Sequence, residues 1–144
     1  MNKMPHYTHS IPDLRLGEFD IGGVLYHAHY YHLYEMAREA LLRDHGIPYS
    51  DFVAHGEHLA IVEANQEFRR PVRYGQKLKV SLSFTGIRRS VFDCHYEIST
   101  PGLGLLHVGR TRHVFVRSAG GNFKPGPLPE NLLKVLKNFE IGTA

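Results

Sequence analysis

The sequence contains a single cysteine, Cys94, which excludes an intramolecular disulfide. It also lacks any apolar run approaching the roughly 20 residues that a membrane-spanning helix needs, so we expect no membrane span. The first residues, from Met1 to Tyr7, have no apolar core of the kind that a secretory signal needs. These absences favour a reducing, cytoplasmic location.

A large excess of charge of one sign is missing as well. The 144 residues include 17 Lys and Arg against 14 Asp and Glu, which gives a net charge of +3 and a pI near 9.1. This excess favours acidic partners but is too mild to demand nucleic acid, and a small anionic ligand would satisfy it. The chain has no internal repeat, low-complexity segment or linker rich in Pro, Gly or Ser. We therefore expect residues 1–144 to form a single domain that buries roughly two-thirds of the surface of its unfolded chain.

The most informative segment runs from Asp20 to Tyr30, DIGGVLYHAHY. One carboxylate lies here a few residues before a predicted helix start, across a flexible Gly22-Gly23 turn. The helix is predicted from Tyr30 to His45 and ends at Gly46. Its apolar side chains recur at helical spacing, at Leu33, Met36, Ala37, Ala40 and Leu41.

The chemistry of this segment suggests transfer of an acyl group to water. The first turn of a helix has free backbone N–H groups and a partial positive charge, so it can hold an oxyanion or a polarised carbonyl oxygen. The preceding loop aims Asp20 at the same place. A lone Asp before a Gly turn is more often structural than catalytic, but a carboxylate beside such donors suggests acyl hydrolysis.

Alternating apolar and polar residues predict strands at Lys77–Phe84 and Phe92–Ser99, and Gly86–Ser90 joins them as a hairpin. One long helix must bury its apolar stripe against a strongly twisted antiparallel sheet, so the predicted fold class is α+β with the sheet wrapped around the helix. The remaining predicted elements are extended segments at Tyr7–Glu18, Leu59–Phe68 and Leu105–Arg117 and a short terminal helix at Leu132–Phe139.

The segment DIGGVLYHAHY at 20–30, continued by YEMAR at 34–38, resembles the opening motif of the hotdog-fold acyl-CoA thioesterases of the 4-hydroxybenzoyl-CoA thioesterase family, YbgC-like branch. Residues 68–78, FRRPVRYGQKL, are similar to that family's exit from its second strand, and residues 124–129, KPGPLP, to its C-terminal segment. The resemblance covers nearly the whole chain. It implies a hotdog fold, with an antiparallel sheet of about five strands around one long helix, and hydrolysis of an acyl-CoA without a cofactor.

By the same resemblance, Asp20 occupies the position of the catalytic carboxylate, and His27 the position whose backbone N–H polarises the thioester carbonyl. The sequence departs from the family pattern at Glu18, where Asp is frequent, and at His29, where Asn is usual. Hotdog proteins of this kind join their sheets edge to edge, so the resemblance implies a homodimer or homotetramer with active sites at the interface.

Two groups of residues admit more than one interpretation. His27, His29 and His32 could suggest a metal, but positions 27 and 29 do not share a helix face and no Cys or carboxylate completes a ligand set, so we expect no metal site. Arg88 and Arg89 at a hairpin tip are either solvated charges or a pair that binds phosphates bidentately. The resemblance favours contacts with the phosphates of coenzyme A.

Three other titratable residues have weaker cases for catalysis. Cys94 alternates with apolar residues and is expected in the core rather than as a nucleophile. Glu35 is a reserve candidate, because some hotdog thioesterases use a glutamate of the helix. Glu63 on the second predicted strand is expected to be paired or to lie at an interface.

The sequence therefore predicts an acyl-CoA thioesterase. Asp20 acts as nucleophile or general base, the His27 amide stabilises the oxyanion, and Arg88 and Arg89 hold the nucleotide phosphates. Two alternatives on the same fold stay open: a non-catalytic module that binds acyl chains or a protein partner, and a hydratase or dehydratase. The acyl group is left unspecified, because scattered apolar side chains and subunit packing form its pocket.

Overall fold

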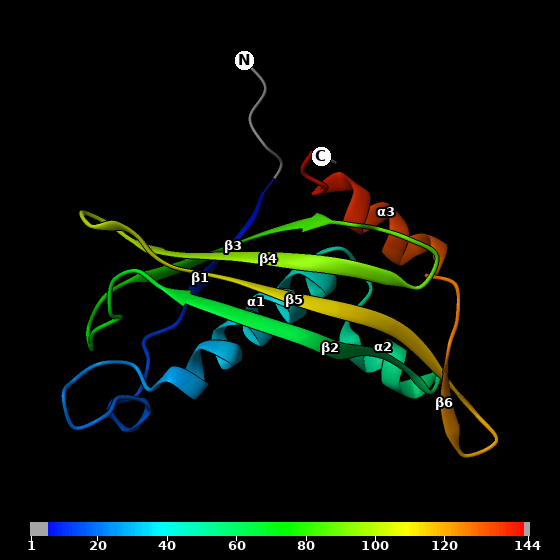
Figure 1. Cartoon of the computed structure of the whole chain (residues 1–144), viewed down its shortest axis with the longest axis horizontal. Helices are drawn as coiled ribbons and strands as arrows, with labels where there is room; N and C mark the ends of the chain where they lie inside the picture. Colours follow the sequence, from blue (N-terminus) through cyan, green and yellow to red (C-terminus); the bar gives the residue numbers. More distant parts are fainter. Residues whose placement is uncertain (1–5, 143–144) are drawn as a thin grey trace.

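One long helix packs against one face of an antiparallel sheet in the computed structural model, which describes residues 6–142 (Figure 1). The helix, α1, spans Tyr30–Asp44. The sheet has six strands in the order β1-β3-β4-β5-β2, and the short β6 pairs with β5 outside this path. The predicted α+β class is confirmed, with one strand more than expected. The strands are β1 (Tyr7–Ile11), β2 (Glu57–Phe68), β3 (Leu78–Thr85), β4 (Val91–Thr100), β5 (Gly104–Ala119) and β6 (Asn122–Pro125).

The other helical elements are short. They are α2 (Tyr49–Ala54), α3 (Glu130–Asn138) and two 3-10 turns, Leu16–Glu18 and His27–His29. Within residues 6–142, no helix is both long enough and apolar enough to cross a membrane. Residues 1–5, which make up most of the Met1–Tyr7 segment without an apolar core, lie outside the described residues.

Helix α1 forms because its 15 residues contain no glycine, proline or β-branched side chain. The predicted apolar stripe faces the sheet, with only Met36 partly exposed, and Tyr30 and Tyr34 extend it toward the N-terminal end. Gly46 ends the helix with a φ of +77°, a left-handed conformation that glycine adopts without steric cost. The stop at Gly46 is therefore where the sequence predicts it.

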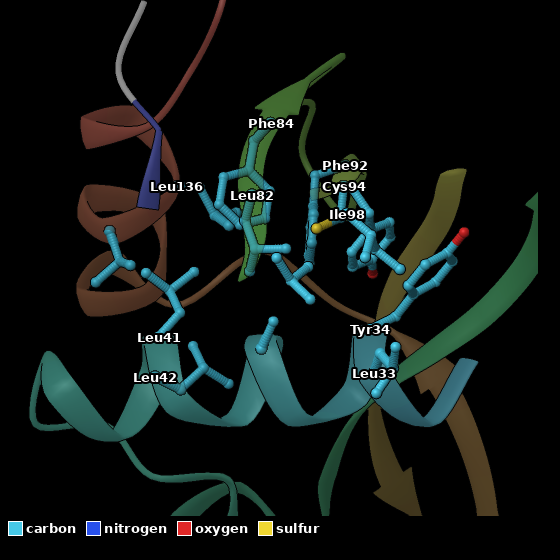
Figure 2. Packing of buried hydrophobic residues seen from close by; sticks show 14 of the residues in the cluster. Leu33, Tyr34, Leu41, Leu42, Leu82, Phe84, Phe92, Cys94, Ile98 and Leu136 are labelled. Atoms are coloured by element: carbon cyan, nitrogen blue, oxygen red, sulfur yellow. The ribbon is translucent and has the colours of Figure 1, made fainter. Parts of the chain in front are cut away.

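The core lies between α1 and the inner face of the sheet. Strands β3 and β4 alternate as predicted, so that every second side chain points toward α1. Figure 2 shows Tyr34 and Leu41 of α1 beside Leu82 and Ile98 of the sheet, and Leu136 brings α3 into the same cluster. Each fully buried leucine or isoleucine here contributes roughly 1.5–3 kcal/mol of transfer free energy.

The segment predicted as extended at Tyr7–Glu18 is a strand only over Tyr7–Ile11, because Leu16–Glu18 forms a 3-10 turn. Two further elements were missed by the sequence patterns, and both are short. Helix α2 follows Pro48 and buries only Phe52, so it carries no apolar stripe. Strand β6 is exposed at all four positions and so shows no alternation. It forms because Gly120 and Gly121, with φ of +58° and +86°, make a tight turn that folds the chain back on β5.

Candidate active site

Asp20 begins a tight turn that its own side chain stabilises. Its Oδ1 accepts hydrogen bonds from the backbone N–H groups of Gly22 (2.9 Å) and Val24 (3.2 Å). The Gly23 N–H donates to the Asp20 carbonyl (2.9 Å) and closes the turn. Within residues 6–142 no donor bonds to Oδ2, so the second carboxylate oxygen of this exposed residue is available to a ligand.

The His27 backbone N–H lies at the start of a continuous helical run. Residues 27–29 form a 3-10 turn that leads directly into α1, so the run begins three residues before the predicted helix. The His29 N–H donates to the Tyr26 carbonyl (2.9 Å), whereas no acceptor in the described part of the chain bonds to the His27 N–H. A free N–H at the positive end of a helix can stabilise an oxyanion. The His27 ring is exposed and packs against Tyr26 at a centroid distance of 4.3 Å.

Asp20 and His27 line one cleft of about 350 Å³. The loop that carries them is tied to the segment after β2, because the Leu25 N–H donates to the Val72 carbonyl (2.8 Å) and Val24 forms a bridge with Arg73. The carboxylate, the helix start and the end of β2 therefore face the same space. The residues that line the cleft are Asp20, Val24, Leu25, His27, Tyr30, Phe68, Arg69, Arg70 and Pro71.

The two residues that depart from the family pattern contact each other. The ring of His29 is hydrogen-bonded through Nδ1 to the Glu18 carbonyl oxygen (2.9 Å). The same ring stacks on His32 at a centroid distance of 5.1 Å. His29 therefore fixes the loop before Asp20 to the helix start, which is a structural role. Within residues 6–142, no group of three or more His, Cys, Asp or Glu side chains is placed to hold a metal ion.

Arg88 and Arg89 do not lie in this cleft within one chain. They are exposed in the β3–β4 hairpin, where the Arg88 N–H donates to the Val91 carbonyl (2.8 Å). Val91 pairs with Val114 of β5, whereas Phe68 in the cleft pairs with His107. Seven residues of an extended strand separate these positions by about 23 Å. The arginine pair and the Asp20 cleft are thus at opposite ends of β5.

Arg69 and Arg70 line the cleft, and the sequence patterns gave them no role. The backbone N–H groups of Arg69 and Arg70 both donate to the Leu106 carbonyl oxygen, at 3.1 and 2.9 Å. These bonds hold the chain against β5 where it leaves β2. Arg69 pairs with Glu67 at 3.1 Å. In the sequence, only their position directly after a predicted strand and before Pro71 could have indicated that they line the cleft.

The other titratable candidates lie elsewhere. Cys94 is completely buried, and burial raises the pKa of its thiol to about 12, so it is an inert core residue as predicted. Glu63 accepts from Arg112 (2.6 Å), in agreement with the expected pairing. Glu35 lies with Arg38 beside a separate cavity of about 150 Å³ between α1, α2 and β2.

Comparisons with known proteins agree on one family. The model of the thioesterase-like superfamily matches residues 14–136. The chain is similar to the 1,4-dihydroxy-2-naphthoyl-CoA hydrolase of Rippkaea orientalis, with 30% identity over 95% of this chain and 98% of that protein. It is 27% identical to the acyl-CoA thioester hydrolase YbgC of Escherichia coli over 82% of this chain and 87% of that one. The crystal structure of a 1,4-dihydroxy-2-naphthoyl-CoA thioesterase from Synechocystis superposes with a TM-score of 0.82 at 26% identity, covering 92% of this chain and 96% of that one.

Proposed function

Because the chain belongs to the thioesterase-like superfamily, we propose that its Asp20 cleft hydrolyses the thioester of an acyl- or aroyl-CoA to the free acid and coenzyme A. The chain has the hotdog fold of this family and is a thioester hydrolase. The observation that carries the assignment of the site is the pairing, in one cleft, of a carboxylate with one free oxygen and an unbonded N–H at a helix start.

Asp20 can act by either of two routes. As a general base, its Oδ2 takes a proton from the water that attacks the carbonyl carbon, the C–S bond breaks, and the thiolate of coenzyme A leaves and is protonated. As a nucleophile, Oδ2 attacks the carbonyl carbon itself and expels the thiolate, and water then hydrolyses the mixed anhydride. Both routes use the carboxylate oxygen that the Gly22 and Val24 N–H groups leave free.

His27 acts through its backbone in this proposal. The oxygen of the thioester carbonyl gains negative charge in the transition state, and the His27 N–H at the positive end of the helical run donates to it. The Gln66 Nε2 donates to the His27 carbonyl oxygen (3.4 Å), which helps to hold this peptide from the side of β2.

His27→Ala should retain most of the activity, because any side chain leaves the backbone donor in place. A loss of a few-fold is expected from the missing ring contact with Tyr26. If the imidazole were instead a general acid or base, the loss would be roughly a hundred- to ten-thousandfold. The pH–rate profiles of the two proteins distinguish these roles. A limb of the wild-type profile that disappears in the variant, together with such a loss, would contradict the backbone role.

We further propose that the enzyme is a homodimer or a homotetramer built from dimers joined along β2. This strand is 12 residues long and exposes Ile61 and Val62 at 49% and 56%. Among the strands of residues 6–142, it pairs only with β5. A long edge strand with exposed apolar side chains favours pairing with a second copy. Light scattering should give at least twice the 16.4 kDa of the chain, whereas an active monomer at assay concentration would contradict the proposal.

A dimer of this kind would complete the site. Two β2 strands related by a two-fold axis run antiparallel, so the Glu57 end of one lies beside the Phe68 end of the other. Glu57 pairs with Arg117 of β5, at the same end of the sheet as the β3–β4 hairpin. The Arg88 and Arg89 of the second copy would thereby approach the mouth of the Asp20 cleft and contact the nucleotide phosphates of the substrate.

Arg88→Ala with Arg89→Ala should raise the KM for an acyl-CoA by about tenfold, with a penalty that shrinks at high salt. A truncated pantetheine thioester, which lacks the nucleotide, should be hydrolysed at nearly the wild-type rate. The matched control is Lys134→Ala with Lys137→Ala, which removes the same charge from an exposed face of α3. An equal loss with both substrates would place the arginine pair outside the phosphate site.

The similar proteins act on aroyl and acyl thioesters of coenzyme A, so we propose substrates of that class. We also propose a cytoplasmic site of action. The test is the release of free thiol from a panel of aliphatic and aromatic acyl-CoAs. Turnover of one or more members supports the proposal. If no member of the panel releases thiol, a non-catalytic binding module is favoured. Hydration of an enoyl-CoA would favour a hydratase.

A further inference from the structure

Beneath the Asp20 cleft, two of its lining residues rest on one buried histidine of β5. The Tyr30 ring stacks on His107 at a centroid distance of 4.2 Å and an angle of 22°. The Phe68 ring meets the same imidazole edge to face at 5.0 Å, and it meets Tyr30 in the same way at 5.0 Å. His107 is fully buried. These three rings form what we call the aromatic floor of the cleft: Tyr30, Phe68 and His107.

The imidazole is also held by Tyr34, one turn along α1 from Tyr30. The Tyr34 hydroxyl is hydrogen-bonded to His107 Nε2, and its ring stacks on Tyr96 at 3.9 Å and 6°. Gly109 makes room for this hydroxyl, because a Cβ at that position would lie 1.7 Å from the oxygen. The local packing is therefore built around the Tyr34–His107 contact.

The contact also favours one tautomer of the neutral imidazole. Burial lowers the pKa of His107 to about 4, so the ring is neutral near pH 7. Within residues 6–142 its Nδ1 has no hydrogen-bond partner. If Tyr34 donates to Nε2, only the Nδ1–H is left unpaired, whereas the opposite tautomer would leave both the tyrosine proton and Nδ1 unpaired. The geometry therefore favours Tyr34 as the donor.

Packing alone does not account for an imidazole at this position. A phenyl ring would fill nearly the same space without an unpaired buried nitrogen, which is costly in an apolar surrounding. What the imidazole adds is the hydrogen bond from Tyr34, which fixes the plane of the ring on which Tyr30 and Phe68 rest.

We propose that His107 is a positioning residue of the hydrolase, which acts through Tyr30 and Phe68 to hold the aromatic floor against which the acyl group rests beside Asp20. The proposal rests on the proposed function of the cleft. His107 does not itself touch the reacting atoms. Tyr34 is the second positioning residue, because its hydroxyl holds the His107 ring. Because the floor supports the acyl group, an acyl group too small to reach it is affected little.

The chain supplies a matched control in His113. This second histidine of β5 is also fully buried, stacks on Phe92 at 5.1 Å and 9°, and has its Nε2 hydrogen-bonded to the Thr111 hydroxyl (2.7 Å). It lies six residues along β5 from His107 and does not line the cleft. Replacing either histidine by phenylalanine removes a buried neutral imidazole and its hydrogen bond to a hydroxyl, and in His113 also the hydrogen bond from Nδ1 to the Leu59 carbonyl oxygen (3.3 Å). Only His107 supports the floor.

The experiment compares kcat and KM for benzoyl-CoA and acetyl-CoA in His107→Phe, Tyr34→Phe and His113→Phe, together with the thermal midpoint of each. We expect both His107→Phe and Tyr34→Phe to lower kcat/KM for benzoyl-CoA by roughly tenfold, with a much smaller change for acetyl-CoA. His113→Phe should leave the ratio of the two substrates unchanged. Tyr34→Phe keeps the test valid if His107→Phe does not fold.

Wild-type kinetics in both His107→Phe and Tyr34→Phe would overturn the proposal. So would equal losses for both substrates that follow the fall in thermal midpoint, because that pattern indicates a merely structural role. If the wild type releases no thiol from any acyl-CoA, the proposed hydrolysis fails separately. In that case the affinity for S-benzyl-CoA, a thioether that cannot be hydrolysed, tests the aromatic floor. About tenfold weaker binding by His107→Phe than by the wild type supports the floor. Equal binding by the two proteins, or no binding by the wild type, overturns it.

Discussion

Asp20→Asn is expected to lower kcat by on the order of a hundredfold or more while the substrate binds almost as before. An amide can neither take a proton from water nor attack a carbonyl carbon at pH 7, so both routes proposed for Asp20 are lost. The fold should be kept, because the side-chain oxygen of asparagine still accepts from the N–H groups of Gly22 and Val24.

The controls for this result come from the same chain. Asp51→Asn makes the same chemical change at an exposed position of α2 and should not alter kcat. Circular dichroism and the thermal midpoint of Asp20→Asn should match those of the wild type. Turnover at the wild-type rate in the folded variant would end the catalytic assignment of Asp20.

The second large effect is a loss of stability in mild acid. Burial lowers the pKa of His107 to about 4 and that of His113 to about 3, whereas an unfolded histidine has a pKa near 6.5. Well above pH 6.5 both residues are neutral in the folded and the unfolded chain. As the pH falls from 6.5 toward 4, only the unfolded chain takes up these two protons, so the free energy of unfolding decreases. Each histidine should cost about 2 kcal/mol at pH 5, or about 4 kcal/mol together.

Urea unfolding at pH 7 and pH 5 measures this loss directly. The double variant His107→Phe with His113→Phe retains the other nine histidines of the chain, and its stability should change much less between the two pH values. The same pH dependence in the wild type and the double variant would show that these two imidazoles do not remain neutral in the folded protein.

The strongly periodic parts of the fold were predictable from the sequence. The stripe from Leu33 to Leu41 placed α1 against a sheet, and Gly46 marked its end, because both depend on interactions within a few residues. The alternation in β3 and β4 likewise identified their buried faces. Helix α2 and strand β6 could not be predicted in this way, since neither buries a periodic set of side chains.

The candidate site was predictable only where it is local. Asp20 and His27 lie in one short motif, so their common cleft depends on one turn and one helix start. The distance between Arg88 and this cleft depends on the register of β2, β4 and β5, which no local pattern contains. The burial of His107 could not be predicted for the same reason. The sequence contains 11 histidines, and only the pairing of the strands shows that this one is buried.

We propose that one thioester-hydrolysing site combines the Asp20 cleft of one subunit with the Arg88–Arg89 pair of another. Subunit complementation tests it most directly: Asp20→Asn and the Arg88→Ala, Arg89→Ala double variant are unfolded, mixed in equal amounts, refolded together and assayed with an acyl-CoA well below its KM. Half of the dimers should be mixed and each should carry one intact site, so the mixture should recover about a quarter of the wild-type specific activity. A mixture no more active than the mean of the two variants, each refolded alone, would contradict the claim.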